Sequence, residues 1–170
     1  MSGTSRTGRV RYGAAVLLAL CLHAGTAVAG ADCTISASGV NFGTYDPLSP
    51  QADDSIASVT VTCNHVPPDT TIVSYTVAVS NGMNGTSAMT RAMSSGSSRL
   101  GYNVFNDAGR SQVLGTGTGG TVVARGSMTV GPGNGNRTRS VTHTFHGRVP
   151  PALDPEPGAY NDTLVLTLTY

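Results

Sequence analysis

The chain has 170 residues, of which 11% are charged, and its ten arginines stand against nine acidic residues with no lysine. This balance excludes the strongly basic surface that binding to nucleic acid or to an anionic membrane requires. With 39% hydrophobic residues, the composition is that of a folded globular protein.

The first 29 residues have the pattern of a secretory signal peptide. Arg6, Arg9 and Arg11 form a basic region, 13–22 is apolar, and 27–29 is a small-residue cleavage site. The apolar run is about half of the roughly 20 residues that a membrane-spanning helix needs. We therefore expect residues 1–29 to be removed and the protein to be secreted through the periplasm.

The remaining 141 residues, 30–170, are enough for one domain with a sizeable core. Alternation of apolar and polar residues predicts strands, and no helical periodicity is present. Val59, Val61 and Cys63 share one face of a strand at 56–63, which we interpret as the hairpin partner of a strand at 71–79. The predicted strands are 33–38, 40–45, 56–63, 71–79, one around 100–104, 121–130, one around 141–145, and 164–170.

Polar, glycine-rich or proline-rich segments separate these strands. We predict loops at 80–98, 115–120, 131–136 and 150–158. The segment 115–120 does not have the lysine and the following helix that a phosphate-binding loop requires. Short, regularly spaced strands between such turns predict an all-β fold, a β-sandwich with its core between two sheets.

Two cysteines remain after the signal peptide has been removed, Cys33 and Cys63. An exported protein meets an oxidising environment, so we expect them to form a disulfide. Closing this loop restricts the unfolded chain by about 3.6 kcal/mol in the loop-entropy model. The alternative is a pair of unbonded buried thiols.

The sequence has no arrangement typical of nucleophilic catalysis. No Gly-x-Ser-x-Gly motif occurs, and serine is abundant in the predicted loops. His143 and His146 point to opposite faces of one strand, so they are poorly placed to bind one metal ion together. We predict a non-enzymatic protein without catalytic residues.

Pairs of carboxylates raise the possibility of a calcium site. Asp53 and Asp54 precede a predicted strand, and Asp154 and Glu156 lie in a proline-rich turn. We interpret both pairs as solvated loop charges. We therefore expect no metal, no cofactor and no small-molecule substrate.

Six segments, spread over the whole of 30–170, together form a recognisable pattern. They are Cys33-Thr-Ile-Ser, Val40-Asn-Phe-Gly-Thr-Tyr-Asp-Pro47, Val59-Thr-Val-Thr-Cys63, Arg91-Ala-Met93, Leu100-Gly-Tyr-Asn-Val-Phe-Asn-Asp107 and Pro157-Gly-Ala-Tyr-Asn-Asp-Thr-Leu-Val-Leu-Thr-Leu-Thr-Tyr170. In this order they resemble the spore coat protein U domain, found in myxobacterial spore coat protein U and in pilin subunits of archaic (Csu-type) chaperone-usher systems. One departure is Leu114, where many members carry Trp.

This resemblance implies an immunoglobulin-like sandwich that in pilus-type members is incomplete. A periplasmic chaperone and then the N-terminal extension of the next subunit supply the missing edge strand, by β-augmentation. A long, uncharged C-terminal strand is the natural acceptor edge, because an open apolar edge aggregates unless it is covered. The expected acceptor residues are Leu164, Leu166, Leu168 and Tyr170. The alternative is that this strand pairs internally and its leucines are ordinary core.

Only Gly30, Ala31 and Asp32 lie between the predicted cleavage site and Cys33. This is too short for a donor strand, so we expect a chain that accepts a strand and does not donate one by this route. We predict a secreted structural subunit, accessory or terminal in an archaic chaperone-usher pilus, or a component of a spore or cell coat.

The resemblance also implies the partners of such a subunit. They are a periplasmic pilus chaperone, an outer-membrane usher and other pilus or coat subunits, at the cell surface, in a fimbrium or in a spore coat. The alternative function is an adhesive module that contacts a surface or a glycan through the loops 80–98 or 131–136.

Overall fold

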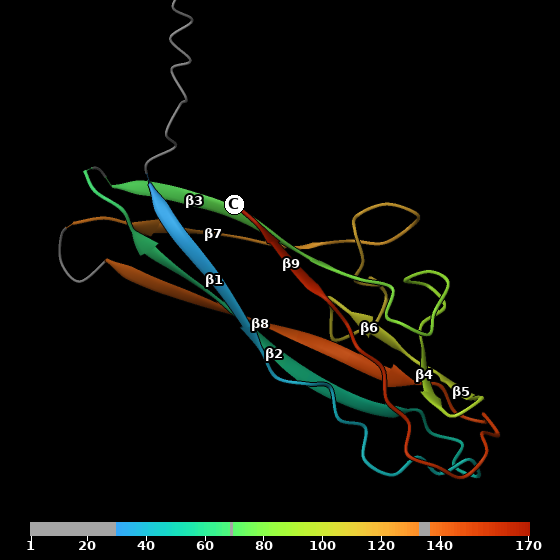
Figure 1. Ribbon diagram of the computed structural model, residues 1–170. Coiled ribbons are helices and arrows are strands. Elements are labelled where there is room, and N and C mark those ends of the chain that lie inside the picture. Colours follow the sequence, from blue (N-terminus) through green and yellow to red (C-terminus); the bar gives the residue numbers. More distant parts are fainter. Residues whose placement is uncertain (1–29, 69, 133–136) are drawn as a thin grey trace, which may run out of the picture.

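The computed structural model describes residues 30–68, 70–132 and 137–170. All regular secondary structure in these ranges is β, in two antiparallel sheets that pack face to face and a separate hairpin (Figure 1). No helix in these ranges is long and apolar enough to cross a membrane. The predicted signal peptide lies outside the described residues. The prediction of an all-β sandwich is confirmed.

The first sheet has the strand order β1-β2-β8-β6. Its two long central strands, β2 and β8, pair from Asp53 opposite Val149 to Asn64 opposite Thr138. The strand β1 forms one edge, and among the described residues it pairs only with β2. The strands are β1 (Ala31–Ala37), β2 (Asp53–His65), β6 (Asn103–Phe105) and β8 (Thr138–Val149).

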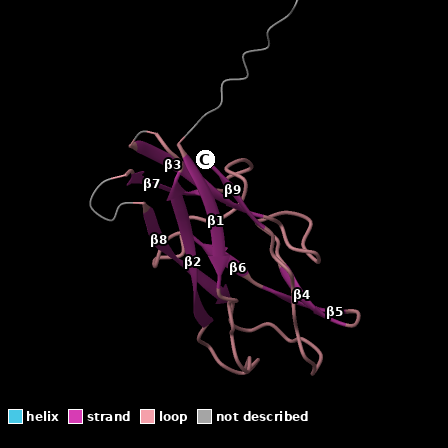
Figure 2. Cartoon of the chain, turned by 60° about the vertical axis from the view of Figure 1, so that its left-hand side comes forward, coloured by secondary structure: helices cyan, strands magenta, loops and turns pink. Residues whose placement is uncertain are grey.

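The second sheet has the order β7-β3-β9, with β3 at its centre. The short strand β9 forms an edge, and within the described ranges it pairs only with β3. A separate hairpin of β4 and β5 lies at the end of the domain opposite the start of β1 (Figure 2). These strands are β3 (Thr71–Val79), β4 (Ala92–Ser95), β5 (Ser98–Gly101), β7 (Ala124–Val130) and β9 (Leu166–Thr169).

The core lies between the two sheets and follows the predicted alternation. Val59, Val61 and Cys63 are at most 1% exposed, whereas the polar residues between them face outward. Because the side chains of a strand alternate between its two faces, one apolar row per strand is enough to fill this space. Other core residues are Val73, Tyr75, Val77, Val79, Leu100, Tyr102, Val104, Phe145 and Val149.

The strands β2 and β3 are not hairpin partners, so that prediction is wrong. β2 pairs with β1 and β8 in the first sheet, and β3 pairs with β7 and β9 in the second. The connection between them therefore carries the chain from one sheet to the other. Alternation cannot distinguish these cases, because both strands turn an apolar face to the same core.

Two further predictions need correction. Residues 40–45 do not form a strand, because the regular ladder with β2 ends near Ser38 and the Asn41 carbonyl accepts the Ser55 hydroxyl instead of an amide. The segment 80–98, predicted to be one loop, contains β4 and the first residue of β5. The strands of this hairpin are four residues each, too short for a periodic signal.

The predicted disulfide between Cys33 and Cys63 is confirmed. The two residues lie directly opposite each other in the β1–β2 pairing, with their Cα atoms 4.0 Å apart. Both side chains are buried and belong to the core cluster. The disulfide thus bonds the edge strand covalently to its only partner strand in the described chain.

A polar contact joins the two sheets across the core. The Tyr75 hydroxyl of β3 lies 2.9 Å from Nε2 of His143 on β8, and the two rings meet edge to face. Burial lowers the pKa of His143 below its ordinary value of 6.5. The neutral imidazole is therefore favoured, and in the tautomer protonated at Nδ1 its Nε2 accepts a hydrogen bond from the Tyr75 hydroxyl.

The disulfide is expected to supply a large part of the stability of this domain. Changing Cys33→Ser together with Cys63→Ser should lower the free energy of unfolding by about 3.6 kcal/mol, because the unfolded chain regains its loop entropy. Urea denaturation of the purified protein measures this change. Wild-type protein unfolded with dithiothreitol should show the same shift, and an unchanged midpoint would contradict the prediction.

The half-buried imidazole of His143 predicts a loss of stability in weak acid. Above pH 6.5 His143 is neutral in both states; below it the unfolded chain binds a proton that the folded chain disfavours, until the pH falls below the lowered pKa. The wild-type protein should therefore lose more stability than a His143→Gln variant between pH 7.5 and 5. Denaturation midpoints of both proteins at each pH measure the difference. Parallel curves of midpoint against pH would contradict the prediction.

Candidate functional site

The edge strands of the two sheets, β1 and β9, leave an open seam along one side of the sandwich. The chain leaves β1 through residues 38–42, and it approaches β9 through 160–165. We call residues 31–42 the first rim and residues 160–169 the second rim. No strand of the described chain joins the two rims.

The first rim directs unpaired backbone groups into the seam. The Ser38 amide donates to the Ser58 carbonyl over 2.9 Å, and bonded residues alternate along an antiparallel ladder. The even-numbered residues of β1 therefore face β2, whereas Cys33 and Ile35 direct their backbone N–H and C=O groups toward the seam. The same two residues turn their side chains to the core.

The second rim has the same arrangement. The Ser80 amide donates to the Val165 carbonyl over 2.9 Å, and Asn161 exchanges two backbone hydrogen bonds with Ser94 of β4. The odd-numbered residues are thus bonded to β3 and β4, and the backbone groups of Leu166 and Leu168 face the seam. Both leucine side chains pack against the core.

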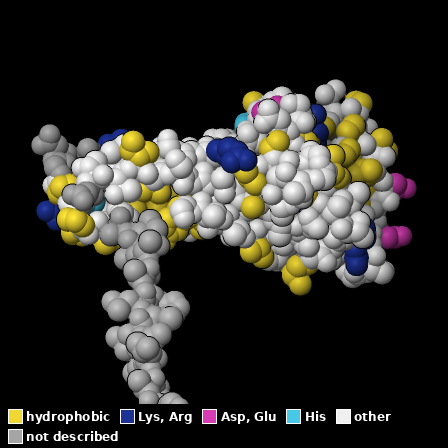
Figure 3. Space-filling view, turned by 90° about the horizontal axis from the view of Figure 1, so that it is seen from above, with side chains coloured by type: hydrophobic (Ala, Val, Ile, Leu, Met, Phe, Trp, Pro, Cys, Tyr) yellow, Lys and Arg dark blue, Asp and Glu magenta, His cyan; other side chains and the backbone are white. Residues whose placement is uncertain are grey.

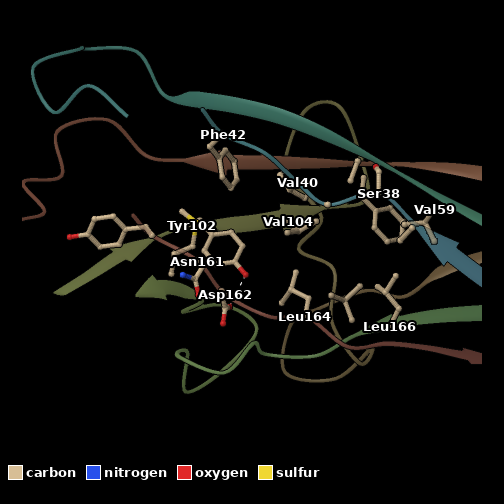
Figure 4. Close-up of a pocket in the computed structure, with 17 residues that line it drawn as sticks. Ser38, Val40, Phe42, Val59, Tyr102, Val104, Asn161, Asp162, Leu164 and Leu166 are labelled. Carbon is tan, nitrogen blue, oxygen red and sulfur yellow. Dashed lines mark hydrogen bonds between the residues drawn. The ribbon is translucent and has the colours of Figure 1, made fainter. Parts of the chain in front are cut away.

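A cavity of about 310 Å³ opens between the rims. Figure 4 shows Leu164 and Leu166 pointing into it from the second rim, with Val40 on the opposite side. Its floor is the core itself, where Val59 and Val104 are each 1% exposed. A row of small apolar side chains inserted here would therefore complete the core.

A second cavity, of about 600 Å³, lies beyond Val40 and Phe42. The loop 40–47 forms one wall, and the segment 155–160 forms the other. Tyr45 and Tyr160 line it, together with prolines from both walls. The two cavities share Val40, Phe42, Met93 and Tyr160, so they adjoin each other along these residues, and we call them together the groove.

Asp162 fixes the second rim to the body of the domain. Its carboxylate accepts the Tyr102 hydroxyl at 2.8 Å, the Met83 amide at 2.9 Å and the Asn84 side-chain amide at 3.0 Å. Gly82 has a φ of +83° and lies so close that a Cβ there would clash with the Asp162 carboxylate. Burial, reinforced by Asp162, raises the pKa of Tyr102 above its ordinary value.

Arg91 holds the same region from within the core. Its guanidinium is 1% exposed and donates to the Asn103 side-chain oxygen at 2.8 Å and, through Nε, to the Ser80 carbonyl at 3.0 Å. Further bonds go to carbonyls at residues 79 and 88. A buried arginine is stabilised by such bonds, and here they bond the segment 80–91 to the end of β3.

Three of the four predicted acceptor residues lie on the second rim, and the fourth, Tyr170, directly follows it. Leu164, Leu166 and Leu168 are partly buried against the core, and the first two line the smaller cavity. Tyr170 is 55% exposed, and its hydroxyl reaches Asp32 of β1 at 3.5 Å, near the end of the seam. The strand pairs with β3 on one side only, so its leucines are core residues and also line an open edge.

The carboxylates considered for a metal site have other partners or lie apart. Asp54 is not a solvated loop charge as predicted, because it lies in β2 and receives two bonds from Arg148 at 2.7 and 2.8 Å. This hydrogen bonding lowers the pKa of Asp54, and Arg110 at 3.1 Å adds to the effect. In the part of the chain that the structure describes, no three His, Cys, Asp or Glu side chains gather as metal ligands.

Of the two loops considered for the adhesive alternative, the structure describes one completely and the other only in part. The segment 80–98 is held by Arg91 and Asp162 and includes β4. Residues 133–136 of the other loop lie outside the described residues. Figure 3 shows one face of the domain, on which hydrophobic side chains lie among uncharged ones and charged groups are few.

Sequence reasoning missed the second cavity. It included Arg91 and Asp162 only as parts of two family segments, without a structural role for either. The available signal was the ending Tyr160-Asn-Asp162, where an acidic residue directly precedes an apolar strand. Phe42, Tyr45 and Tyr160 come from opposite ends of the chain, so no local pattern indicates that they meet.

Comparison with known proteins gives one family and one fold. The family model described as Spore Coat Protein U domain matches residues 19–167. A similar solved structure is the CsuC-CsuE chaperone-tip adhesion subunit pre-assembly complex from archaic chaperone-usher Csu pili of Acinetobacter baumannii, with a TM-score of 0.51 and 23% identity over 82% of this chain. The match spans 40% of that structure's chain, and it establishes the fold alone. No curated protein matches.

Because the Asp162 carboxylate accepts three hydrogen bonds, we expect it to stabilise the second rim. An Asp162→Ala variant leaves the buried Tyr102 hydroxyl and two amides without their acceptor, which should lower the free energy of unfolding by about 2–3 kcal/mol. Chemical denaturation measures the loss. The matched control is Asp154→Ala, on an exposed proline-rich turn, where a change within about 0.5 kcal/mol is expected. Equal effects at the two positions would contradict the assignment.

Proposed function

We propose that this chain, which belongs to the Spore Coat Protein U domain family, is an exported structural subunit that accepts a β-strand from a partner in its open seam. The single observation that carries the proposal is the pair of unpaired rims above the core. Their backbone groups face the seam, and the apolar side chains of the core line its floor. This is the arrangement that strand addition requires.

The chemistry of the seam favours a strand as its occupant. Main-chain N–H and C=O groups on both rims need hydrogen-bond partners along their length, and an extended chain supplies them at the matching spacing. Its alternate side chains would enter the cavity beside Leu164 and Leu166. A strand inserted here would also cover an edge that otherwise promotes aggregation.

The proposed partners are a periplasmic pilus chaperone, an outer-membrane usher and other pilus or coat subunits. A chaperone is part of the similar solved complex, whose other named protein is a tip adhesion subunit. The proposal brings this kind of partner to the present chain because both have the same fold. It assigns the chain a structural role with no catalytic step.

Export is part of the proposal. The signal-peptide pattern of residues 1–29 and the disulfide are both consistent with passage into an oxidising compartment. The protein would act at the cell surface, in a fimbrium or in a spore coat.

We further propose an accessory or terminal position, or a place in a coat layer. If cleavage follows Ala29, the mature chain enters β1 at its second residue, and β1 is already paired along its whole length with β2. No stretch between the cleavage site and the sheet would then remain to be donated. Such a subunit accepts a strand and ends or decorates an assembly.

The strand-accepting function predicts that two neighbouring substitutions affect binding of the partner differently. Leu166→Arg places a charge in the seam and should weaken binding of the partner about 100-fold or more, because a buried unpaired charge costs several kcal/mol. Val165→Arg, on the outward face where Val165 is 60% exposed, is the matched control and should leave binding unchanged.

The measurement is copurification of the tagged chain from periplasm with a partner identified by mass spectrometry. The expected partner is a stoichiometric chaperone of immunoglobulin-like type, retained with Val165→Arg and lost with Leu166→Arg. Thermal denaturation of both variants checks that the Leu166→Arg domain is folded. A protein that is secreted as a folded monomer without a chaperone would rule out the proposed function.

A further inference from the structure

We propose that the inserted strand does not end over the first cavity but continues into the second, where a bulky apolar side chain anchors it. This inference rests on the proposed strand-accepting function and adds the length and end chemistry of the partner segment. The first cavity alone would hold only the middle part of the inserted strand. The second one distinguishes a partner that has the anchor from one that does not.

The two rims have similar lengths and end at the second cavity. The first runs from Ala31 to Phe42, and the second runs back from Thr169 to Tyr160. At about 3.3 Å per residue, the first rim spans roughly 40 Å and the second roughly 33 Å, so a strand of about eleven residues is needed to follow them. A segment of six or seven residues would cover only the first cavity.

The two tyrosine hydroxyls of the second cavity are already hydrogen-bonded. The Tyr45 hydroxyl donates to the Pro150 carbonyl and accepts the Leu153 amide, both at 2.9 Å. The Tyr160 hydroxyl donates to the Glu156 carbonyl at 2.6 Å. With these hydroxyls bonded elsewhere, the aromatic and proline side chains offer mainly apolar surface, which an aromatic or branched aliphatic side chain fits.

The charge of the groove selects against acidic partners. Among the described residues that line the two cavities, the charged side chains are Asp162 and Glu156, and no arginine is present. An acidic residue on the inserted strand near either position would face a like charge and lose hydration. The partner segment is therefore apolar in alternate positions and free of acidic residues over the second cavity.

The register of the second rim fixes which rim residue each residue of an added strand would face, so a strand can be designed to test the proposal. An Asn-Gly turn after Tyr170 directs an added strand back along β9, antiparallel to it. Its first residue then lies opposite Tyr170, its third, fifth and seventh opposite Leu168, Leu166 and Leu164, and its eleventh opposite Tyr160. The even-numbered residues of the second rim face the seam, so these odd positions of the added strand face the groove.

The experiment compares fusions of the full chain with such strands, each built of valine at odd and threonine at even positions, with serine at the ninth position facing Asp162. One strand has seven residues, and three have eleven, ending in phenylalanine, alanine or aspartate. Thermal denaturation of each secreted protein gives its midpoint temperature. Titration with a hydrophobic dye reports whether the groove is still open.

The phenylalanine fusion should melt about 5 °C above the alanine fusion, since it buries an aromatic side chain, and the aspartate fusion should melt below both. Equal midpoints for phenylalanine and alanine would overturn the second-cavity anchor while leaving strand acceptance intact. If the seven-residue strand itself gives no rise over the unfused chain and no loss of dye binding, the proposed function fails instead.

A substitution within the chain itself is the control for the aspartate fusion. Glu156→Gln removes the facing carboxylate at an exposed position, so the midpoint of the aspartate fusion should rise toward that of alanine, while that of the phenylalanine fusion stays unchanged. An aspartate fusion whose midpoint does not respond to Glu156→Gln would overturn the charge selection.

Discussion

The absence of pairing between β1 and β9 is the constraint on which the arrangement of this domain depends. The described part of the chain begins in one sheet and ends in the other, and these two edge strands face the same side of the sandwich without a described strand between them. The apolar residues that an additional strand would cover are instead reached through the groove, whose floor is formed by Val59 and Val104. The seam is therefore part of the core, and its two walls must be held apart by contacts elsewhere.

These contacts differ for the two rims. The first rim is bonded covalently to β2 by Cys33–Cys63, so its register with that strand is fixed. The second rim has no such bond and is supported by polar side chains: Asp162 accepts three hydrogen bonds, and the buried Arg91 fixes the segment that Asp162 contacts. The guanidinium of Arg91 is buried and the carboxylate of Asp162 is half-buried. Such groups require a specific geometry, since their hydrogen bonds must offset the lost hydration.

The sequence was sufficient for the elements whose signal is local. Alternation at Val73 to Val79 and at Val59 to Cys63 identified core strands, and a single remaining cysteine pair left one possible disulfide. Sheet membership could not be obtained in this way, because β2 and β3 present the same pattern to one core from opposite sides. Asp162 appeared as one polar residue before an apolar run; its partners at 83, 84 and 102 lie at least 60 residues away in the chain. The second cavity likewise depends on Phe42 and Tyr160 meeting across the fold.

The open seam also changes what the stability of this domain means. A segment that binds the folded chain and not the unfolded one shifts the folding equilibrium by mass action, by about 2.7 kcal/mol when its free concentration is one hundred times its dissociation constant. The melting temperature of such a domain is then a function of the concentration and affinity of its occupant. If a partner strand occupies the seam as proposed, two preparations of the same chain with identical covalent structure would differ in half-life according to what each had encountered, and the folded state would be completed only in an assembly.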